Sequence, residues 1–333
     1  MADTEKPMGK KNDKIEKNGE ELNIQKKRSK KFCTMKRLLI LFISISVILL
    51  ITIIFILAFA VNKKNKNNNN DDINITKVPD TEDEYDEFEL NDVNLTYAVL
   101  TPKDGYDNIF IFLGGISEFA RKYFSFFKSN STFVPKGTKI YLLSGQIRQM
   151  QFMIDKYSLP FPVPGWFNVD TKGNLIPNND FTEAKKSLEL VLDEIDRIKN
   201  DDKVDYKNIY LGGFSQGAIM TNYILLNSRY ELGGYLPFSG YVFDHDFSSN
   251  QLITNLTSVQ ISKLEARKNY HILATHSFAD ETVFYNLAAE SYSVYFRNYT
   301  DFTLFSFGNI GHEFEKQPIF YNVRNWLKKS MGK

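Results

Sequence analysis

A serine between two glycines is the first feature of this sequence that could do chemistry. Residues 213–217 read Gly-Phe-Ser-Gln-Gly, which matches the pattern G-x-S-x-G. An apolar, β-prone run at 208–212 precedes Ser215, and a helical pattern at 216–227 follows it. A strand, turn and helix in this order expose a nucleophilic serine and point the helix N-terminus at the reacting oxygen. Because the chain has 18 glycines, the short motif also arises by chance, so Ser215 needs partners.

A nucleophilic serine needs a base, and the base needs an acid that orients it. On folds with this turn the partners follow in the order Ser, Asp or Glu, His. His312, in the stretch GHEF, lies between the last predicted strand and the C-terminal helix, so it is the predicted base. The other histidines precede the required position or stand before any later acid, and we expect structural or surface roles for them: His245, His271 and His276.

The predicted acid is Asp280, in the stretch THSFADETV, because it directly follows a predicted strand and precedes His312. Glu281 is adjacent and is the alternative. Asp244 and Asp246 follow an earlier strand and are weaker candidates.

Two backbone N–H groups must also face the oxyanion that forms during acyl transfer. One is expected from Gln216, the residue after the nucleophile. The second is expected from the stretch LGGISE at 113–118, with Ile116 or a neighbour as the donor. The pair Gly114 and Gly115 would let the backbone approach the substrate.

The elements that must position these residues alternate between strands and helices. Such alternation predicts an α/β fold with a mostly parallel sheet flanked by helices. Thr182 is the expected N-cap of the helix predicted at 182–199. Apolar strand-like runs lie at 108–115, 139–145, 208–213, 270–277 and 302–308, and helical patterns lie at 182–199, 216–227, 283–296 and 317–329.

The segment 146–170 differs from the rest, because it has three prolines, many aromatic residues and no clean period. Long irregular segments in compact domains are often functional. The segment is therefore either a lid or groove wall for the substrate, or a structural loop packed by its aromatic side chains.

Four stretches, GGFSQGA, PGWFNVD, THSFADETV and GHEF, resemble the acyl-protein thioesterase branch of the phospholipase/carboxylesterase family, which are α/β-hydrolases. The resemblance covers roughly residues 95–330. It implies hydrolysis of acyl esters or thioesters without a metal or organic cofactor. It also implies a set of site residues: the triad Ser215, Asp280 and His312, the oxyanion donors Ile116 and Gln216, and an acyl groove around Trp166 and Phe167.

The sequence departs from that family in two places. The family usually has His-Gly-x-Gly-Asp where this chain has Gly-Gly-Ile-Ser-Glu at 114–118, and proline where it has Glu281. The first departure leaves a second hypothesis open, namely a hydrolase fold used as a membrane-tethered binding module with little turnover. A serine peptidase is a third, weaker hypothesis.

An uncharged run of 24 residues, Leu38–Val61, is long enough to cross a bilayer as a helix. A buried core helix and a signal peptide cleaved after Ala60, which would release a secreted protein, are the alternatives. Seven lysines and arginines within 26–37, against three within 63–66, favour a cytoplasmic N-terminus. The sequence thus predicts a type II membrane protein whose catalytic domain is lumenal or extracellular.

Four regions follow from this interpretation: a basic cytoplasmic tail at 1–37, a signal-anchor helix at 38–61, an Asn-rich and acidic stalk at 62–93, and a catalytic domain at 94–333.

Cys33, the single cysteine, is either palmitoylated beside the membrane or a free thiol. A net charge of +1 argues against a nucleic-acid partner. The oligomeric state is not indicated. Five N-x-S/T sequons follow the apolar run, at Asn74, Asn94, Asn130, Asn255 and Asn298.

Overall fold

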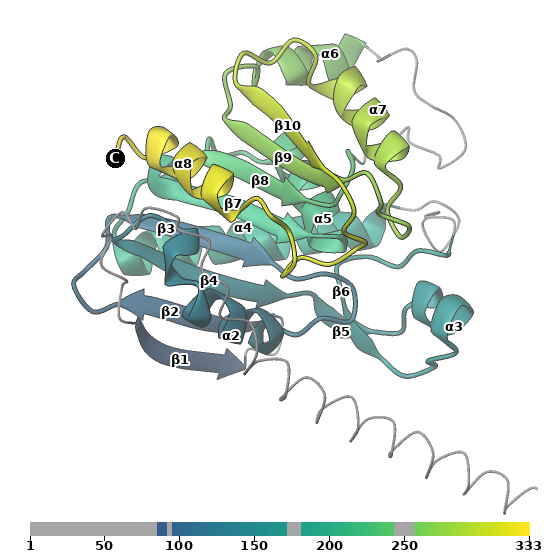
Figure 1. Ribbon diagram of the computed structural model, residues 1–333, viewed down its shortest axis with the longest axis horizontal. Helices are drawn as coiled ribbons and strands as arrows, with labels where there is room; N and C mark the ends of the chain where they lie inside the picture. The colour runs from purple at the N-terminus through teal and green to yellow at the C-terminus, as the bar shows by residue number, and fades with distance from the viewer. Residues whose placement is uncertain (1–84, 92–94, 172–180, 243–255, 257) are drawn as a thin grey trace, which may run out of the picture. The chain divides into compact units, whose positions relative to one another are not determined.

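Eight strands form one sheet in the computed structural model, in the order β1-β2-β4-β3-β7-β8-β9-β10 (Figure 1). The structure describes residues 85–91, 95–171, 181–242, 256 and 258–333, all within a compact unit that spans Pro79–Lys333. The strands of this sheet are β1 (Tyr85–Asn91), β2 (Thr96–Pro102), β3 (Asn108–Leu113), β4 (Thr138–Ser144), β7 (Ile209–Phe214), β8 (Gly234–Phe238), β9 (Ile272–Ser277) and β10 (Phe302–Phe307).

Only the β1–β2–β4 edge is antiparallel, and every pair from β4 to β10 is parallel. Strands β3, β7, β8 and β9 are buried along their whole length. Parallel strands read as continuous apolar runs because helices cover both of their faces. The predicted α/β fold with a mostly parallel sheet is therefore confirmed.

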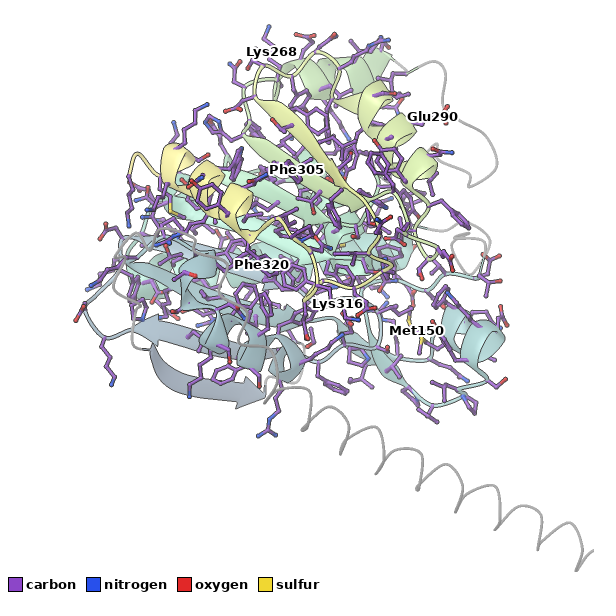
Figure 2. The ribbon with its side chains drawn as sticks, in the orientation of Figure 1. Met150, Lys268, Glu290, Phe305, Lys316 and Phe320 are labelled. Atoms are coloured by element: carbon purple, nitrogen blue, oxygen red, sulfur yellow. The ribbon has the colours of Figure 1, made fainter. Side chains whose placement is uncertain are left out.

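Helices lie on both faces of the sheet (Figure 1). Side chains of α4, α5 and α7 share one apolar core with one face, and those of α2 and α8 share a second core with the other. Phe320 of α8, labelled in Figure 2, packs against aromatic rings of α2 and the following turn. The helices are α2 (Ala120–Ser129), α3 (Gln151–Tyr157), α4 (Thr182–Asp202), α5 (Gln216–Asn227), α6 (Ser258–Glu265), α7 (Tyr285–Tyr295) and α8 (Phe320–Ser330), with 3₁₀ turns η1 (Ser131–Phe133) and η2 (Tyr206–Asn208).

Two details of the sequence analysis were wrong. Residues 85–91, assigned to the stalk, form strand β1, which pairs antiparallel with β2. The ladder bonds are made by the backbone, so an acidic segment can still close the sheet as its edge strand. The N-cap of α4 is Phe181 and not Thr182, and no side chain caps this helix.

The segment 146–170 contains regular structure that its composition conceals. Strands β5 (Gln146–Arg148) and β6 (Val163–Gly165) pair into a small antiparallel sheet, and α3 lies between them. Met150, labelled in Figure 2, forms a small apolar cluster with Met153 and Val163.

Within the described residues, no helix is both long and apolar enough to cross a membrane. The predicted span, Leu38–Val61, lies outside those residues, as do the predicted tail and most of the predicted stalk.

Candidate active site

Ser215 lies on a sharp turn between β7 and α5. Its φ of 55° and ψ of −118° fall outside the regions that residues with a side chain normally adopt. The strain is held by close packing of the turn. A Cβ atom on Gly217 would lie 2.1 Å from the carbonyl oxygen of Leu113, and one on Gly213 would lie 2.5 Å from that of Gly217. Only glycine fits at both positions, which is why they flank the serine.

The side chains of Ser215, His312 and Asp280 form a continuous chain of hydrogen bonds. His312 Nε2 lies 2.7 Å from Ser215 Oγ, and His312 Nδ1 lies 2.7 Å from Asp280 Oδ2. Because an ionised carboxylate only accepts, the proton of neutral His312 is assigned to Nδ1, which leaves Nε2 free to accept the serine proton. The ring of Phe214 lies against the imidazole, with 4.7 Å between the ring centroids.

Asp280 is buried, yet it remains ionised. Burial is the strongest influence on its pKa and raises it, but the hydrogen bond and charge of His312 and the N–H groups of Val283 and Thr282 outweigh burial. The pKa of Asp280 is therefore lowered from its ordinary value of 3.8. The two N–H groups donate to Asp280 Oδ1 at 2.8 and 2.9 Å and leave Oδ2 for the histidine.

A second histidine lies beside the same carboxylate. His276 is fully buried, and its Nε2 lies 2.7 Å from the carbonyl oxygen of Val283 and 3.6 Å from Asp280 Oδ2. Burial is the main cause that lowers the pKa of His276 from 6.5, so the ring is neutral and Nε2 donates to Val283. His276 thus fixes the loop that presents Asp280, a contact that the sequence analysis missed.

The remaining candidates lie elsewhere. Glu281, the alternative acid, is exposed to solvent. His271 bonds Asp301 at the opposite end of β9 from the site. His245, Asp244 and Asp246 lie outside the described residues.

The stretch Gly114–Glu118 forms a tight turn over the serine. The N–H of Glu118 donates to the carbonyl oxygen of Gly115 at 3.2 Å, and Ser117 has a φ of 62°. A Cβ atom on Gly115 would lie 3.4 Å from that of Ser215. Within the described residues, the N–H of Ile116 donates no hydrogen bond. It is therefore available to a ligand at the serine.

Gln216, the first residue of α5, also starts with a backbone N–H that has no partner within its helix. Its side chain acts elsewhere. Oε1 accepts from the N–H of Trp166 at 2.9 Å, and Nε2 donates to the carbonyl oxygen of Phe167 at 2.7 Å. The Gln216 side chain therefore fastens the helix N-terminus to the segment after β6.

Trp166 and Phe167, the predicted groove residues, are buried in the core and line neither cavity at Ser215. Trp166 donates from Nε1 to the carbonyl oxygen of Gly114 at 2.8 Å. A ring of this size, packed beneath the turn, supports the backbone over the serine and leaves contact with substrate to other side chains. Their part in an acyl groove, which the resemblance implied, therefore stays a prediction, and in the structure they lie behind the two cavities.

Two cavities meet at Ser215, and both are also lined by Ile116, Phe152 and Thr282. The first has a volume of about 180 Å³ and a mainly apolar lining that includes Val169, Ile219, Tyr241, Val283, Phe284 and Leu287. The second has a volume of about 330 Å³ and a more polar lining that includes Gly115, Ser117, Glu118, Met153, Tyr157 and His312.

The sequence analysis missed most of these lining residues. The available signal was the set of apolar residues at 283, 284 and 287, directly after the predicted acid. They give the helix predicted at 283–296 an apolar face beside the site. Among the residues that the structure describes, no cluster of three or more His, Cys, Asp or Glu side chains could hold a metal ion.

Comparisons with known proteins show the family and the fold of this chain. The sequence profile of the phospholipase/carboxylesterase family matches residues 96–331. Acyl-protein thioesterase 1 of Kluyveromyces lactis is 38% identical over 79 residues, which are 24% of this chain and 34% of that protein. The Arabidopsis thaliana protein "Probable carboxylesterase SOBER1-like" is 24% identical over 173 residues, which are 51% of this chain and 60% of that protein. The chain thus spans less than two thirds of the length of these relatives.

The crystal structure of Zea mays acyl-protein thioesterase 2 has a TM-score of 0.54 at 18% identity, and the match covers 71% of this chain and 99% of that one. At this identity the likeness concerns the fold, which is that of the α/β-hydrolases. Since the family profile matches well over half of the sequence, the chain belongs to the phospholipase/carboxylesterase family.

Proposed function

We propose that the protein is a serine hydrolase that cleaves carboxylic esters or thioesters through an acyl-enzyme. The observation that carries the proposal is the chain of hydrogen bonds from Ser215 through His312 to Asp280. A serine hydroxyl without a neighbouring base is a weak nucleophile. A histidine that accepts its proton and an aspartate that orients the histidine activate it.

In the first step Ser215 Oγ attacks the acyl carbon, and its proton passes to His312 Nε2. Asp280 accepts from Nδ1 and stabilises the imidazolium that forms. The N–H groups of Ile116 and Gln216 hold the oxyanion. When the C–O or C–S bond breaks, His312 returns the proton to the leaving alcohol or thiol. Water, deprotonated by His312, then attacks the acyl-enzyme and releases the acid and free Ser215.

The two cavities divide the substrate between them. The apolar cavity beside Ser215 fits the acyl chain, because its walls are aliphatic and aromatic carbon. The more polar cavity, which includes His312, fits the leaving group, because His312 must reach the departing oxygen or sulfur. Ester and thioester substrates both satisfy this division.

A fluorophosphonate probe tests the proposal directly, since it reacts only with an activated serine. We expect labelling of the wild type that disappears in Ser215→Ala, together with turnover of p-nitrophenyl and thiocholine esters. A matched control is Ser293→Ala, on an exposed position of α7. A folded wild type that is neither labelled nor active would contradict the proposal.

The second candidate is a binding module with little turnover, and one observation favours it: Ser117 adopts a left-handed backbone in the turn that must supply an oxyanion donor. The same experiment separates the candidates. A module would bind acyl compounds in the apolar cavity without labelling at Ser215. A serine peptidase is the weaker alternative, and turnover of amides in place of esters would support it.

We also propose that residues 38–61 anchor the chain in a bilayer and that the hydrolase domain faces the lumen or the outside of the cell. The uncharged run and the charge difference across it support this placement. Protease protection of the domain in intact vesicles is the test. Digestion of the domain by protease added on the cytoplasmic side would show the opposite orientation. Release of the protein from the membrane by carbonate would exclude the anchor.

A further inference from the structure

Within the turn that carries Ile116, Glu118 makes two bonds to Gly115. The carboxylate oxygen Oε2 of Glu118 accepts from the N–H of Gly115 at 3.1 Å, and the N–H of Glu118 donates to the carbonyl oxygen of Gly115 at 3.2 Å. Glu118 therefore bonds both backbone polar groups of Gly115. The turn is closed twice, once by the backbone and once by the side chain.

The backbone closure sets the direction of the next N–H group, and the side-chain closure holds the preceding peptide, between Gly114 and Gly115. The carbonyl of Gly115 and the N–H of Ile116 belong to one peptide plane, and in a trans peptide they point in opposite directions. Since the carbonyl points at the N–H of Glu118, the N–H of Ile116 points out of the turn. Ile116 and Gly115 both lie at the cavity wall beside Ser215.

A buried tyrosine fixes the carboxylate in turn. The hydroxyl of Tyr123 donates to Glu118 Oε2 and lies 3.4 Å from the N–H of Gly115. Burial, followed by the charge of Glu118, raises the pKa of Tyr123 well above 10.0, so the hydroxyl remains a donor. The Tyr123 ring packs on Phe112 and on Phe314, two residues after His312, with centroids 4.7 and 5.8 Å away.

The turn needs such support because its own conformation is unfavourable. Ser117 has a φ of 62°, a region in which residues other than glycine are strained by about 1 kcal/mol or more. Gly114 and Gly115 add backbone freedom. The N–H of Ser117 is tied to the carbonyl oxygen of Pro164 at 2.8 Å, but this bond does not restrain the Gly115 peptide.

We propose that Glu118, held by Tyr123, is a positioning residue for acyl transfer that keeps the N–H of Ile116 aimed at the oxyanion beside Ser215. The inference rests on the proposed function and deepens it. Glu118 lies at the wall of the more polar cavity but bonds none of the triad side chains, and it acts through the backbone of Gly115.

Three variants test the inference by steady-state hydrolysis of a short p-nitrophenyl ester. Glu118→Ala removes the acceptor, and we expect kcat to fall by about 10- to 100-fold with KM within about threefold, because the oxyanion forms after substrate binds. Glu118→Gln keeps an oxygen that accepts from Gly115, so it restores most of kcat. Tyr123→Phe removes only the hydroxyl and lowers kcat in the same direction as Glu118→Ala.

A trifluoromethyl ketone, which binds Ser215 as a tetrahedral oxyanion, supplies a second readout. The affinity of the ketone should fall in Glu118→Ala by the same factor as kcat/KM. If Glu118 had a merely structural role, the folded variant would bind the ketone as tightly as the wild type does. The matched control is Glu265→Ala, which truncates an exposed glutamate paired with Lys268. If Glu118→Ala does not fold, Tyr123→Phe decides by the same criteria.

The failure of this inference differs from failure of the proposed function. An active wild type whose Glu118→Ala and Tyr123→Phe variants keep kcat within about threefold would overturn the inference alone. A folded wild type without turnover or fluorophosphonate labelling would overturn both.

Discussion

His276 Nε2 lies 3.6 Å from Asp280 Oδ2, and both side chains are buried from solvent. The same nitrogen donates to the carbonyl oxygen of Val283, whose N–H in turn donates to Asp280. His276, Val283 and Asp280 thus form one closed unit. The family that this chain belongs to usually has a proline after the aspartate, and here that unit holds the loop in which Glu281 takes the proline's place.

This unit predicts a pH dependence of stability. The pKa of His276 is lowered in the folded state, so below 6.5 the unfolded chain binds a proton that the folded chain refuses. The free energy of unfolding should therefore fall as pH drops below 6.5, by up to about 1.4 kcal/mol per pH unit. The titratable neighbours that face His276 are Asp280, which opposes this shift, and His312, which adds to it.

Urea unfolding between pH 7 and pH 4 measures this effect. In His276→Gln, whose amide can still donate to Val283, the slope below pH 6.5 should be smaller than in the wild type. Asp280 does not confuse the comparison, because both proteins keep it and its lowered pKa places most of its own loss of stabilisation below 3.8. Equal slopes in the two proteins would show that His276 does not supply the effect.

Asp280→Asn should abolish most of the activity. The asparagine cannot hold the Nδ1 proton of His312 as a carboxylate does, and a change of this kind in a serine triad lowers kcat by about 10⁴-fold. Ester hydrolysis measured beside Glu281→Gln is the check. Glu281 is exposed, so its variant should keep near-wild-type kcat, and the opposite pattern would make Glu281 the acid.

Gly217→Ala should destabilise the fold strongly, because its methyl group would lie 2.1 Å from the carbonyl oxygen of Leu113. Because the neighbouring atoms belong to the backbone, they cannot move aside easily. We therefore expect the free energy of unfolding to fall by about 3 kcal/mol or more. Gly308→Ala is the control, since a Cβ atom there has no neighbour within 4 Å. Equal unfolding midpoints for the two variants would contradict the close approach of α5 to β3.

Leu287→Trp should shorten the acyl chain that the enzyme accepts. Leu287 lines the apolar cavity of about 180 Å³, and an indole there would occupy space for carbon atoms of the chain. We expect kcat/KM to fall for octanoyl esters while acetyl esters, which do not reach that wall, are hydrolysed as before. A uniform loss for both substrates would mean that the acyl chain lies elsewhere.

If the domain faces the lumen, Asn298 should carry a glycan more fully than Asn130. Both are sequons, but Asn298 is exposed, whereas the side-chain amide of Asn130 donates to the carbonyl oxygen of Phe126 at 2.8 Å. Asn298→Gln should therefore produce the larger mobility gain after expression in a secretory system. Insensitivity of the wild type to glycosidase would count against the lumenal placement.

The sequence alone predicted the fold class and the motif positions. Apolar runs at 208–213 and 270–277 became the buried strands β7 and β9, with no end shifted by more than two residues. Such runs are local signals, since a strand covered on both faces must be apolar throughout. The order of Ser215, Asp280 and His312 was also visible, because chain order needs no coordinates.

Only the tertiary structure decided which groups meet. The chain separates His312 from Ser215 by 97 residues, and the parallel register of the sheet brings them within 2.7 Å. The same folding buried Trp166, for which the family resemblance had implied a place in the acyl groove. Strand β1 was hidden for a related reason, because its place in the sheet is given by backbone pairing with β2, a segment that follows it in the chain.

The bonds between Gly115 and Glu118 and between His276 and Val283 show the same limit most clearly. Residue type and spacing identify the groups that could react, because reactivity belongs to the side chain. The direction of an N–H group or the neighbour of a buried imidazole depends on contacts between distant segments, which packing of the whole domain determines.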